Sequence, residues 1–194
     1  MMFMPLFLPG IVEVDCGRCR ASHCLGDGIF DGHGDDLVMV VLPADHMIKD
    51  EQRFCMQLKR AIKVAERGQL TTFGIQPMRP DTDFGYIKAH LRSIQDICAV
   101  EHLTERPDNV TAECFLEEGD YCWNSGTFAW RASVIREEFG RNLPEGYRTV
   151  DIIFAESQDA PGFQRAVENH FPAMLSISID YGVLEKSKRA MYRN

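Results

Sequence analysis

An unbroken apolar run, residues 37–42, constrains the fold of this chain more than any other stretch. A continuous run of this length is typical of a strand that is buried on both faces, as in a parallel sheet. Pro43 ends the strand, because proline has no N–H to give to a ladder. Asp45 and His46 follow directly, and open α/β sheets bind ligands beyond the carboxyl ends of their strands. The stretch therefore predicts an α/β fold with a functional carboxylate at Asp45.

The residues after this strand predict a βαβ unit. Apolar side chains recur at helical spacing from Phe54 to Ala65, and Gly68 is placed to end that helix. Residues 70–75, LTTFGI, predict the next strand, joined to the first by a right-handed crossover. Farther along, we expect a short strand from Gly85, an aromatic-rich stretch at 121–131, and helices at 110–118, 132–139, 164–169 and 179–190.

Composition limits the class of protein. A chain of 194 residues fits one domain that buries its own core. The formal net charge of -8 argues against nucleic acid or an anionic membrane as a general partner. We find no apolar run of membrane-spanning length. Seven cysteines, an odd number at irregular spacing, predict reduced thiols and a cytoplasmic protein.

The first 35 residues lack a clear period. They are apolar at first and then mix Cys, His, Gly and Asp, so we expect an irregular segment ahead of a domain at 36–194. A group of four side chains here has a spacing that could bind zinc tetrahedrally: Cys16, Cys19, His23 and Cys24. The alternative is that the cluster arose by accident and binds no metal.

Five motifs occur in one order along the chain. They are VVLPADHMIKD, TFGIQPMRPDTDFGYI, ERPD, GDYCWNSGTFAWRA and SISIDYGVLEK, and they cover about residues 35–186. Together they resemble bacterial mannose-1-phosphate guanylyltransferases. The resemblance implies a Rossmann-like, mixed and mostly parallel sheet flanked by helices. It also implies an enzyme that joins mannose 1-phosphate and GTP into GDP-mannose and pyrophosphate, a precursor of polysaccharides.

The resemblance assigns the metal site to Asp45. This residue matches the family's metal-binding aspartate, which implies that it is catalytic and that Mg²⁺ is the cofactor, as is usual where phosphates are transferred. The alternative is a loop aspartate that caps the next helix. His46 also follows the family pattern, but a structural histidine fits it equally well.

The sugar side of the pocket is implied by three motifs. Gly85, beside Tyr86, matches a glycine that lets the backbone approach the sugar; a turn glycine is the alternative. Glu105 matches an acid that bonds sugar hydroxyls, and Arg106 stands where the family has a phosphate-binding lysine with a catalytic role. Arginine keeps the charge but has a different shape. Asn124 matches the mannose-binding asparagine, with a turn residue between two strands as the alternative.

The last motif contributes Asp180 and Lys186 as further substrate-binding candidates. On an α-helix Tyr181 and Glu185, four residues apart, share a face, so a polar face could reach the pocket. A solvated helix face is the alternative.

The departures from the family define a second hypothesis. Nothing in residues 1–35 resembles the family's glycine-rich phosphate loop, and the chain stops before the family's DVGSW motif. Asp83 stands where the family has glycine. Residues 20–33, back-translated and shifted by one nucleotide, can be read as an alanine-rich family helix, which suggests a frame-shifted segment. The alternative function is therefore an inactive remnant that at most binds sugar phosphate. The sequence leaves a homo-oligomer open.

Overall fold

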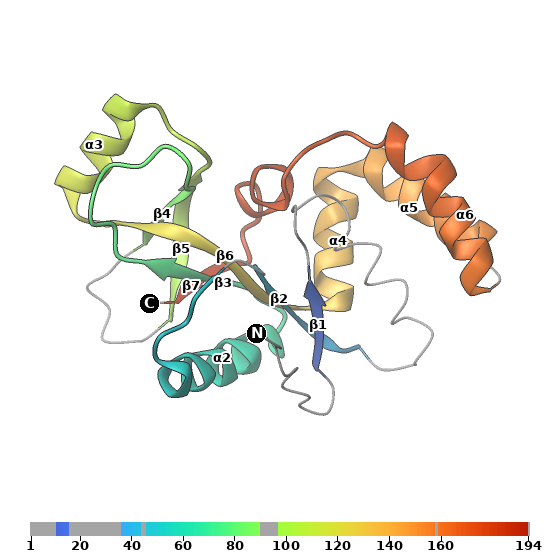
Figure 1. Ribbon diagram of the computed structural model, residues 1–194, viewed down its shortest axis with the longest axis horizontal. Helices are drawn as coiled ribbons and strands as arrows, with labels where there is room; N and C mark the ends of the chain where they lie inside the picture. Colours follow the sequence, from blue (N-terminus) through green and yellow to red (C-terminus); the bar gives the residue numbers. More distant parts are fainter. Residues whose placement is uncertain (1–10, 16–35, 44–45, 90–96, 158, 194) are drawn as a thin grey trace.

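The computed structural model describes residues 11–15, 36–43, 46–89, 97–157 and 159–193. Its centre is a mixed sheet with helices on both faces (Figure 1). The strands follow one another in the sheet in the order β1-β2-β6-β3-β7-β5-β4. Their bounds are β1 Ile11–Asp15, β2 Val38–Leu42, β3 Leu70–Ile75, β4 Tyr86–Ala89, β5 Ile97–Thr104, β6 Tyr121–Arg131 and β7 Ala190–Arg193.

The long strand β6 organises this sheet. It is antiparallel to β3 along one edge, and along the other edge it pairs with β2 through its second half and with β4 through its first half. The pairs β1–β2 and β3–β7 are parallel, whereas β4–β5 and β5–β7 are antiparallel. The mixed, mostly parallel sheet is confirmed, since β1, β2, β3, β4 and β7 point in one direction and only β5 and β6 in the other; most neighbouring pairs are nevertheless antiparallel, because β6 lies between β2 and β3.

Strand β2 is buried on both faces, as its apolar run predicts. Val38 and Val40 pack with the helix α2 (Glu51–Ala65), in a cluster that includes Ala61 and Phe73. The alternate side chains pack into the larger cluster on the other face, which contains Met39, Val41, Phe128, Trp130, Ile135 and Phe139. The helix α4 (Ala132–Asn142) supplies the last two. Alternation along one strand thus joins two helical layers through the sheet.

Two smaller helical units flank this centre. The helix α3 (Asn109–Glu118) begins at Asp108, whose carboxylate accepts a hydrogen bond from the Thr111 N–H, and ends at Gly119 with φ 73°. It covers an aromatic cluster around Tyr86 and Trp123. The helices α5 (Pro144–Glu156) and α6 (Ala160–His170) form a pair at the opposite end of the molecule from α3, with a small core of their own (Figure 1).

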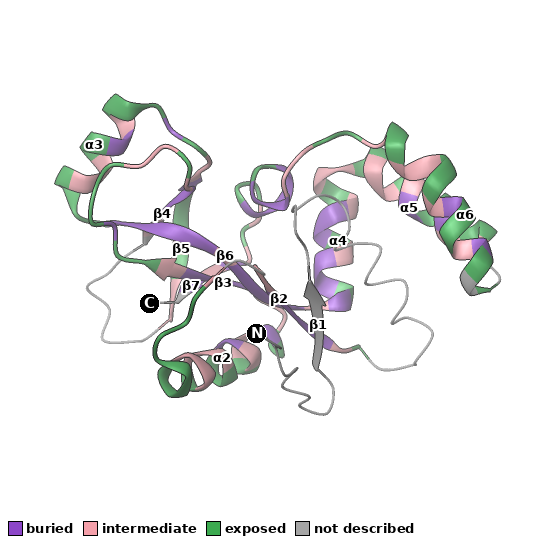
Figure 2. Ribbon diagram, in the orientation of Figure 1, coloured by how far each residue is buried: buried purple, intermediate pink, exposed green. Residues whose placement is uncertain are grey.

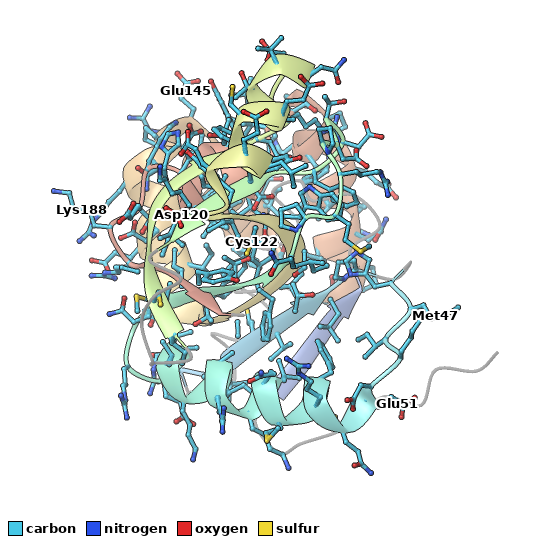
Figure 3. All side chains as sticks on the ribbon, turned by 90° about the vertical axis from the view of Figure 1, so that its left-hand side faces the viewer. Met47, Glu51, Asp120, Cys122, Glu145 and Lys188 are labelled. Atoms are coloured by element: carbon cyan, nitrogen blue, oxygen red, sulfur yellow. The ribbon has the colours of Figure 1, made fainter. Side chains whose placement is uncertain are left out.

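Burial follows these layers (Figure 2). The central strands are buried, whereas α5, α6 and α2 are largely exposed on their outer faces. In Figure 3, Cys122 lies among the strands, and Met47, Glu145 and Lys188 project at the periphery. No disulfide joins the described cysteines. None of the described helices is long and apolar enough to cross a membrane.

Most of the predicted elements are confirmed. They include the strand at 70–75, the strand that begins beside Gly85, and the helices that cover 110–118, 132–139 and 164–169. The aromatic-rich stretch is one continuous strand. The helix α5 and the strand β5 carried no recognised periodicity and were not predicted. Residues 11–15, expected to be irregular, form β1 beside β2.

The helix expected at 179–190 is wrong. A short π-helix, η2 (Asp180–Leu184), is followed by turns and then by β7, which inserts between β3 and β5. A 3-10 turn, η1 (Phe171–Ala173), precedes it. Pairing on both edges of β7 outweighs the weak local helical preference of its residues.

Candidate functional site

A bulge in β6 builds the centre of the candidate site. Asn124 pairs with Gly74 of β3, and the next registered pair is Phe128 with Thr72. Between these two pairs β6 contains more residues than β3, so the extra residues of β6 form a bulge. Gly126 lies in the bulge with φ 70°. Bulges of this kind redirect a side chain and are common beside active sites. Asn124 is therefore part of one strand, which rules out the alternative of a turn between two strands.

The side chain of Asn124 is buried and held by hydrogen bonds from three directions. Its Oδ1 accepts from the Thr72 hydroxyl at 2.7 Å and from the Gly126 N–H at 3.3 Å. Its Nδ2 donates to Oδ1 of Asp180 at 2.7 Å. Its backbone N–H donates to the carbonyl of Gly85 at 2.7 Å. These contacts join β3, β6, η2 and the residue before β4 into one cluster.

Gly85 lies so close to Glu105 that a side chain would not fit. A Cβ added at Gly85 would lie 2.5 Å from Oε2 of Glu105 and 3.5 Å from Cβ of Asn124. Gly85 is buried, and it is not among the residues with positive φ. Close approach, rather than backbone conformation, therefore favours glycine here, because a side chain would displace Glu105 from its position; this favours the site interpretation over a turn glycine.

The carboxylates of the cluster are electrostatically coupled. Burial, reinforced by the charge of Glu105, raises the pKa of Asp180 to about 7, although the hydrogen bond from Asn124 opposes the shift. Burial also raises the pKa of Glu105, with Arg106 opposing and Glu185 reinforcing. A carboxyl with a pKa of about 7, such as that of Asp180, can both donate and accept hydrogen bonds near neutral pH. This cluster, Gly85, Glu105, Asn124 and Asp180, is hereafter the carboxyl–amide cluster; it suits a ligand with several hydroxyl groups.

The two basic candidates lie differently. Arg106 is exposed, has φ 46°, and is close enough to Glu105 to lower its pKa. Lys186 is exposed, and its Nζ lies 6.0 Å from the centre of the Tyr181 ring. The helix that carries Tyr181 is a π-helix rather than the expected α-helix, and in it the Glu185 N–H bonds the carbonyl of Asp180, five residues back. No described contact joins Lys186 to the carboxyl–amide cluster.

Tyr86 serves the core rather than the open side of the site. Its side chain is fully buried, and its hydroxyl accepts a hydrogen bond from the Asp81 N–H at 3.0 Å. Its ring lies 5.3 Å from that of Phe115. The Tyr86 hydroxyl therefore supports the loop before β4. Because the side chain is fully buried, it does not face the open side of the site.

The predicted metal ligands lie outside the described residues. This holds for Asp45 and for the zinc candidates Cys16, Cys19, His23 and Cys24. Among the residues that the structure describes, no group of three or more His, Cys, Asp and Glu could hold a metal ion. Proteins usually bind Mg²⁺ through one or two carboxylates together with substrate phosphates, so a single aspartate such as Asp45 has the right donor chemistry.

Sequence reasoning missed two members of the site. Thr72 lies in the recognised TFGI motif, where a polar side chain interrupts an apolar strand, and that interruption was a usable signal. Glu185 was placed on the polar face that could reach the pocket but was not named as a site residue; it is close enough to raise the pKa of Glu105.

The chain is similar to known proteins of one family. The sequence profile described as "Nucleotidyl transferase" matches residues 23–168. The chain is 39% identical over 159 residues to the xanthan biosynthesis protein XanB of Xanthomonas campestris pv. campestris, covering 82% of this chain and 34% of that protein. It is also 39% identical to a mannose-1-phosphate guanylyltransferase of Salmonella montevideo, covering 79% of this chain and 34% of that protein. The chain thus spans about a third of these relatives.

Two solved structures share the fold. One, titled mannose-1-phosphate geranyltransferase and coming from Thermus thermophilus, has a TM-score of 0.74 and 29% identity, covering 88% of this chain and 48% of that one. Another, titled mannose-6-phosphate isomerase from Helicobacter pylori, has a TM-score of 0.76 and 25% identity, covering 94% and 70%. With its profile match, its relatives and its mixed sheet flanked by helices, the chain belongs to the nucleotidyl transferase family.

Proposed function

We propose that this chain carries the sugar-phosphate side of a mannose-1-phosphate guanylyltransferase. In that reaction a phosphate oxygen of mannose 1-phosphate attacks the α-phosphorus of GTP, and pyrophosphate leaves as GDP-mannose forms. The proposal places the protein in the biosynthesis of polysaccharide precursors, in the cytoplasm. The observation that carries it is the carboxyl–amide cluster. Its four residues come from four separate sequence motifs, in a chain related to guanylyltransferases.

The cluster supports binding of the sugar. Near neutral pH the Asp180 carboxyl can accept or donate hydrogen bonds to hydroxyl groups, the Glu105 carboxylate can accept them, and Asn124 has one amide N–H besides the one given to Asp180. Gly85 keeps the approach open, because any side chain there would collide with Glu105. Arg106, next in the chain to Glu105 and exposed, is proposed to hold the phosphate.

Mg²⁺ is proposed as the cofactor, with Asp45 as its protein ligand. When bound, the ion would neutralise charge on the phosphate oxygens. The contributions proposed for the described residues are binding and orientation. Glu105, Asn124 and Asp180 fix the hexose, and Arg106 fixes its phosphate near the position from which it attacks.

The decisive experiment is an assay of the isolated chain with GTP, mannose 1-phosphate and Mg²⁺, in which GDP-mannose and pyrophosphate are separated by chromatography. The expected result is stoichiometric formation of both products, abolished by EDTA and by Asp45→Ala. The control variant Asp120→Ala changes an exposed aspartate outside the cluster and should turn over normally. Absence of product from a folded chain would contradict the proposed turnover.

A second measurement separates turnover from binding. Titration calorimetry of the chain with mannose 1-phosphate alone should give saturable binding that Asn124→Ala weakens. Binding without turnover would support the alternative hypothesis, a non-catalytic protein that binds sugar phosphate. Failure to bind mannose 1-phosphate would contradict the proposed function but would leave an inactive remnant, which at most binds sugar phosphate.

A further inference from the structure

We propose that Thr72 is a positioning residue, which holds the Asn124 amide so that Asn124 presents an N–H donor, and no acceptor, to the ligand. The inference deepens the proposed function and rests on it for the identity of the ligand. It stands on the geometry of the hydrogen bonds around Asn124 and assigns a role to a residue that the motifs did not single out.

The first step is the count of donors and acceptors on Asn124. An amide oxygen accepts two hydrogen bonds, and an amide nitrogen donates two. Both acceptor positions of Oδ1 are filled within the protein, by the Thr72 hydroxyl at 2.7 Å and the Gly126 N–H at 3.3 Å. One N–H of Nδ2 is given to Asp180. The other has no protein partner among the described residues, so it is what Asn124 can offer to a bound molecule.

The second step is that the reverse orientation of the amide is unfavourable. A flipped amide would turn its NH₂ toward the Gly126 N–H, two donors, and would bring Oδ1 against Asp180, two acceptors whenever that carboxyl is ionised. Because a backbone N–H can only donate, Gly126 fixes the orientation independently of any hydroxyl. Two hydrogen bonds restrain Oδ1, and the one from the Thr72 hydroxyl, at 2.7 Å, is shorter than the one from the Gly126 N–H, at 3.3 Å.

The third step is the placement of Thr72. Its side chain is buried, and its hydroxyl also lies 3.4 Å from the carbonyl of Thr127, across the bulge of β6. Thr72 reaches Asn124 from β3, and Asp180 reaches the same amide from η2. The Asn124 amide is therefore held between the Thr72 hydroxyl and the Asp180 carboxyl, with the Gly126 N–H setting which way it faces. Such pre-organisation lowers the cost of ordering the site when a ligand binds.

The neighbouring residue supplies a matched control. Thr71 is fully buried on the same strand, and its hydroxyl has no hydrogen-bond partner in the described part of the chain. Thr71→Val and Thr72→Val make the same chemical change one residue apart, on opposite faces of β3. Because the Thr71 hydroxyl makes no hydrogen bond to the described residues, Thr71→Val shows the effect of the Thr→Val change alone, and any additional loss of affinity in Thr72→Val is due to the hydrogen bond to Asn124.

The first test measures mannose 1-phosphate affinity by titration calorimetry. Thr72→Val should bind about tenfold more weakly, as expected for loss of one buried, positioning hydrogen bond. Thr72→Ser, which keeps the hydroxyl, should stay within about threefold of the unaltered chain, and Thr71→Val within about twofold. Equal losses in Thr71→Val and Thr72→Val, or no loss in Thr72→Val, would overturn the proposal.

The second test does not depend on the ligand. In ¹⁵N-labelled protein the side-chain amide signals of Asn124 are identified by their disappearance in Asn124→Asp. Thr72→Val should move or broaden those signals, whereas Thr71→Val and Thr72→Ser should leave them in place. Unmoved signals in Thr72→Val would refute the positioning role even if the ligand binds. If the unaltered chain fails to bind mannose 1-phosphate but these signals respond as expected, the proposed ligand is wrong and the positioning by Thr72 stands.

Discussion

Polar side chains are buried in the carboxyl–amide cluster and exposed in the helix pair α5–α6. In the cluster, Asn124 and Asp180 are buried, and each polar atom relies on a specific partner. In the helix pair, polar contacts such as Gln164 with Glu168 are exposed, and water can replace either partner. Unpaired buried groups are costly and unpaired exposed groups are not. Similar substitutions should therefore have very different effects in the two regions.

The largest effect is expected for Asn124→Leu. This change leaves the Thr72 hydroxyl, the Gly126 N–H and the Asp180 carboxyl without their partner. The free energy of unfolding should fall by about 3 kcal/mol, with loss of sugar-phosphate binding. Urea unfolding followed by circular dichroism measures the first effect. A loss below about 1 kcal/mol would show that water readily replaces these contacts.

The next effect concerns pH. Because the pKa of Asp180 is raised to about 7 in the fold, folding favours its protonated form. That stabilisation is complete at low pH and is lost as pH rises through about 7. Between pH 5 and pH 8 the contribution of Asp180 to the free energy of unfolding should fall by about 2 kcal/mol.

Asp180→Asn provides the comparison for this measurement. Its amide oxygen can still accept from Asn124, and it does not titrate, so its stability should vary less with pH than that of the unaltered chain. In Glu105→Gln the midpoint should move to lower pH, since the charge of Glu105 helps to raise the pKa of Asp180. Parallel pH profiles for the unaltered chain and Asp180→Asn would contradict the raised pKa.

A smaller effect on stability, paired with a clear effect on binding, is expected for Gly85→Ala. The new Cβ meets the end of the Glu105 side chain, which can swing away, so the free energy of unfolding should change by less than about 1 kcal/mol. Mannose 1-phosphate should nevertheless bind about fivefold more weakly, because Glu105 leaves its position.

Gly119→Ala is the matched control for that variant. Gly119 has φ 73° and nothing lies near its added Cβ, so alanine should cost about 1 kcal/mol of stability through backbone strain. Binding should be unchanged, because Gly119 ends α3, away from the carboxyl–amide cluster. Similar binding losses in the two variants would show that Gly85 acts only through stability.

The smallest effect is expected in the helix pair. Gln164→Ala removes an exposed hydrogen bond to Glu168 four residues away on α6. The free energy of unfolding should change by less than about 0.5 kcal/mol, and binding not at all. A larger loss, measured in the same urea series, would mean that the outer face of α6 is covered by something in solution.

Local patterns were enough to predict the framework. The apolar run before Pro43 indicated a strand buried on both faces, and Val40 and Val41 do pack on opposite sides of the sheet. The helix α3 was predicted between the Pro107 turn and Gly119. Elements whose sequences lack a strong hydrophobic period were not predicted correctly. The helix α5 and the strand β5 were missed, and η2 together with β7 was predicted as one helix. Their conformations depend on partners elsewhere in the chain.

The sequence by itself determined the family and most of the residues of the candidate site, because motifs preserve residue types in order. It named Gly85, Glu105, Asn124 and Asp180. Only the tertiary structure decided how they act on one another. Thr72 and Asp180 lie 52 and 56 residues from Asn124 in the chain, yet both bond its amide. Local spacing carries no information about such contacts, since they arise when a bulged strand, its neighbour and a π-helix are packed together.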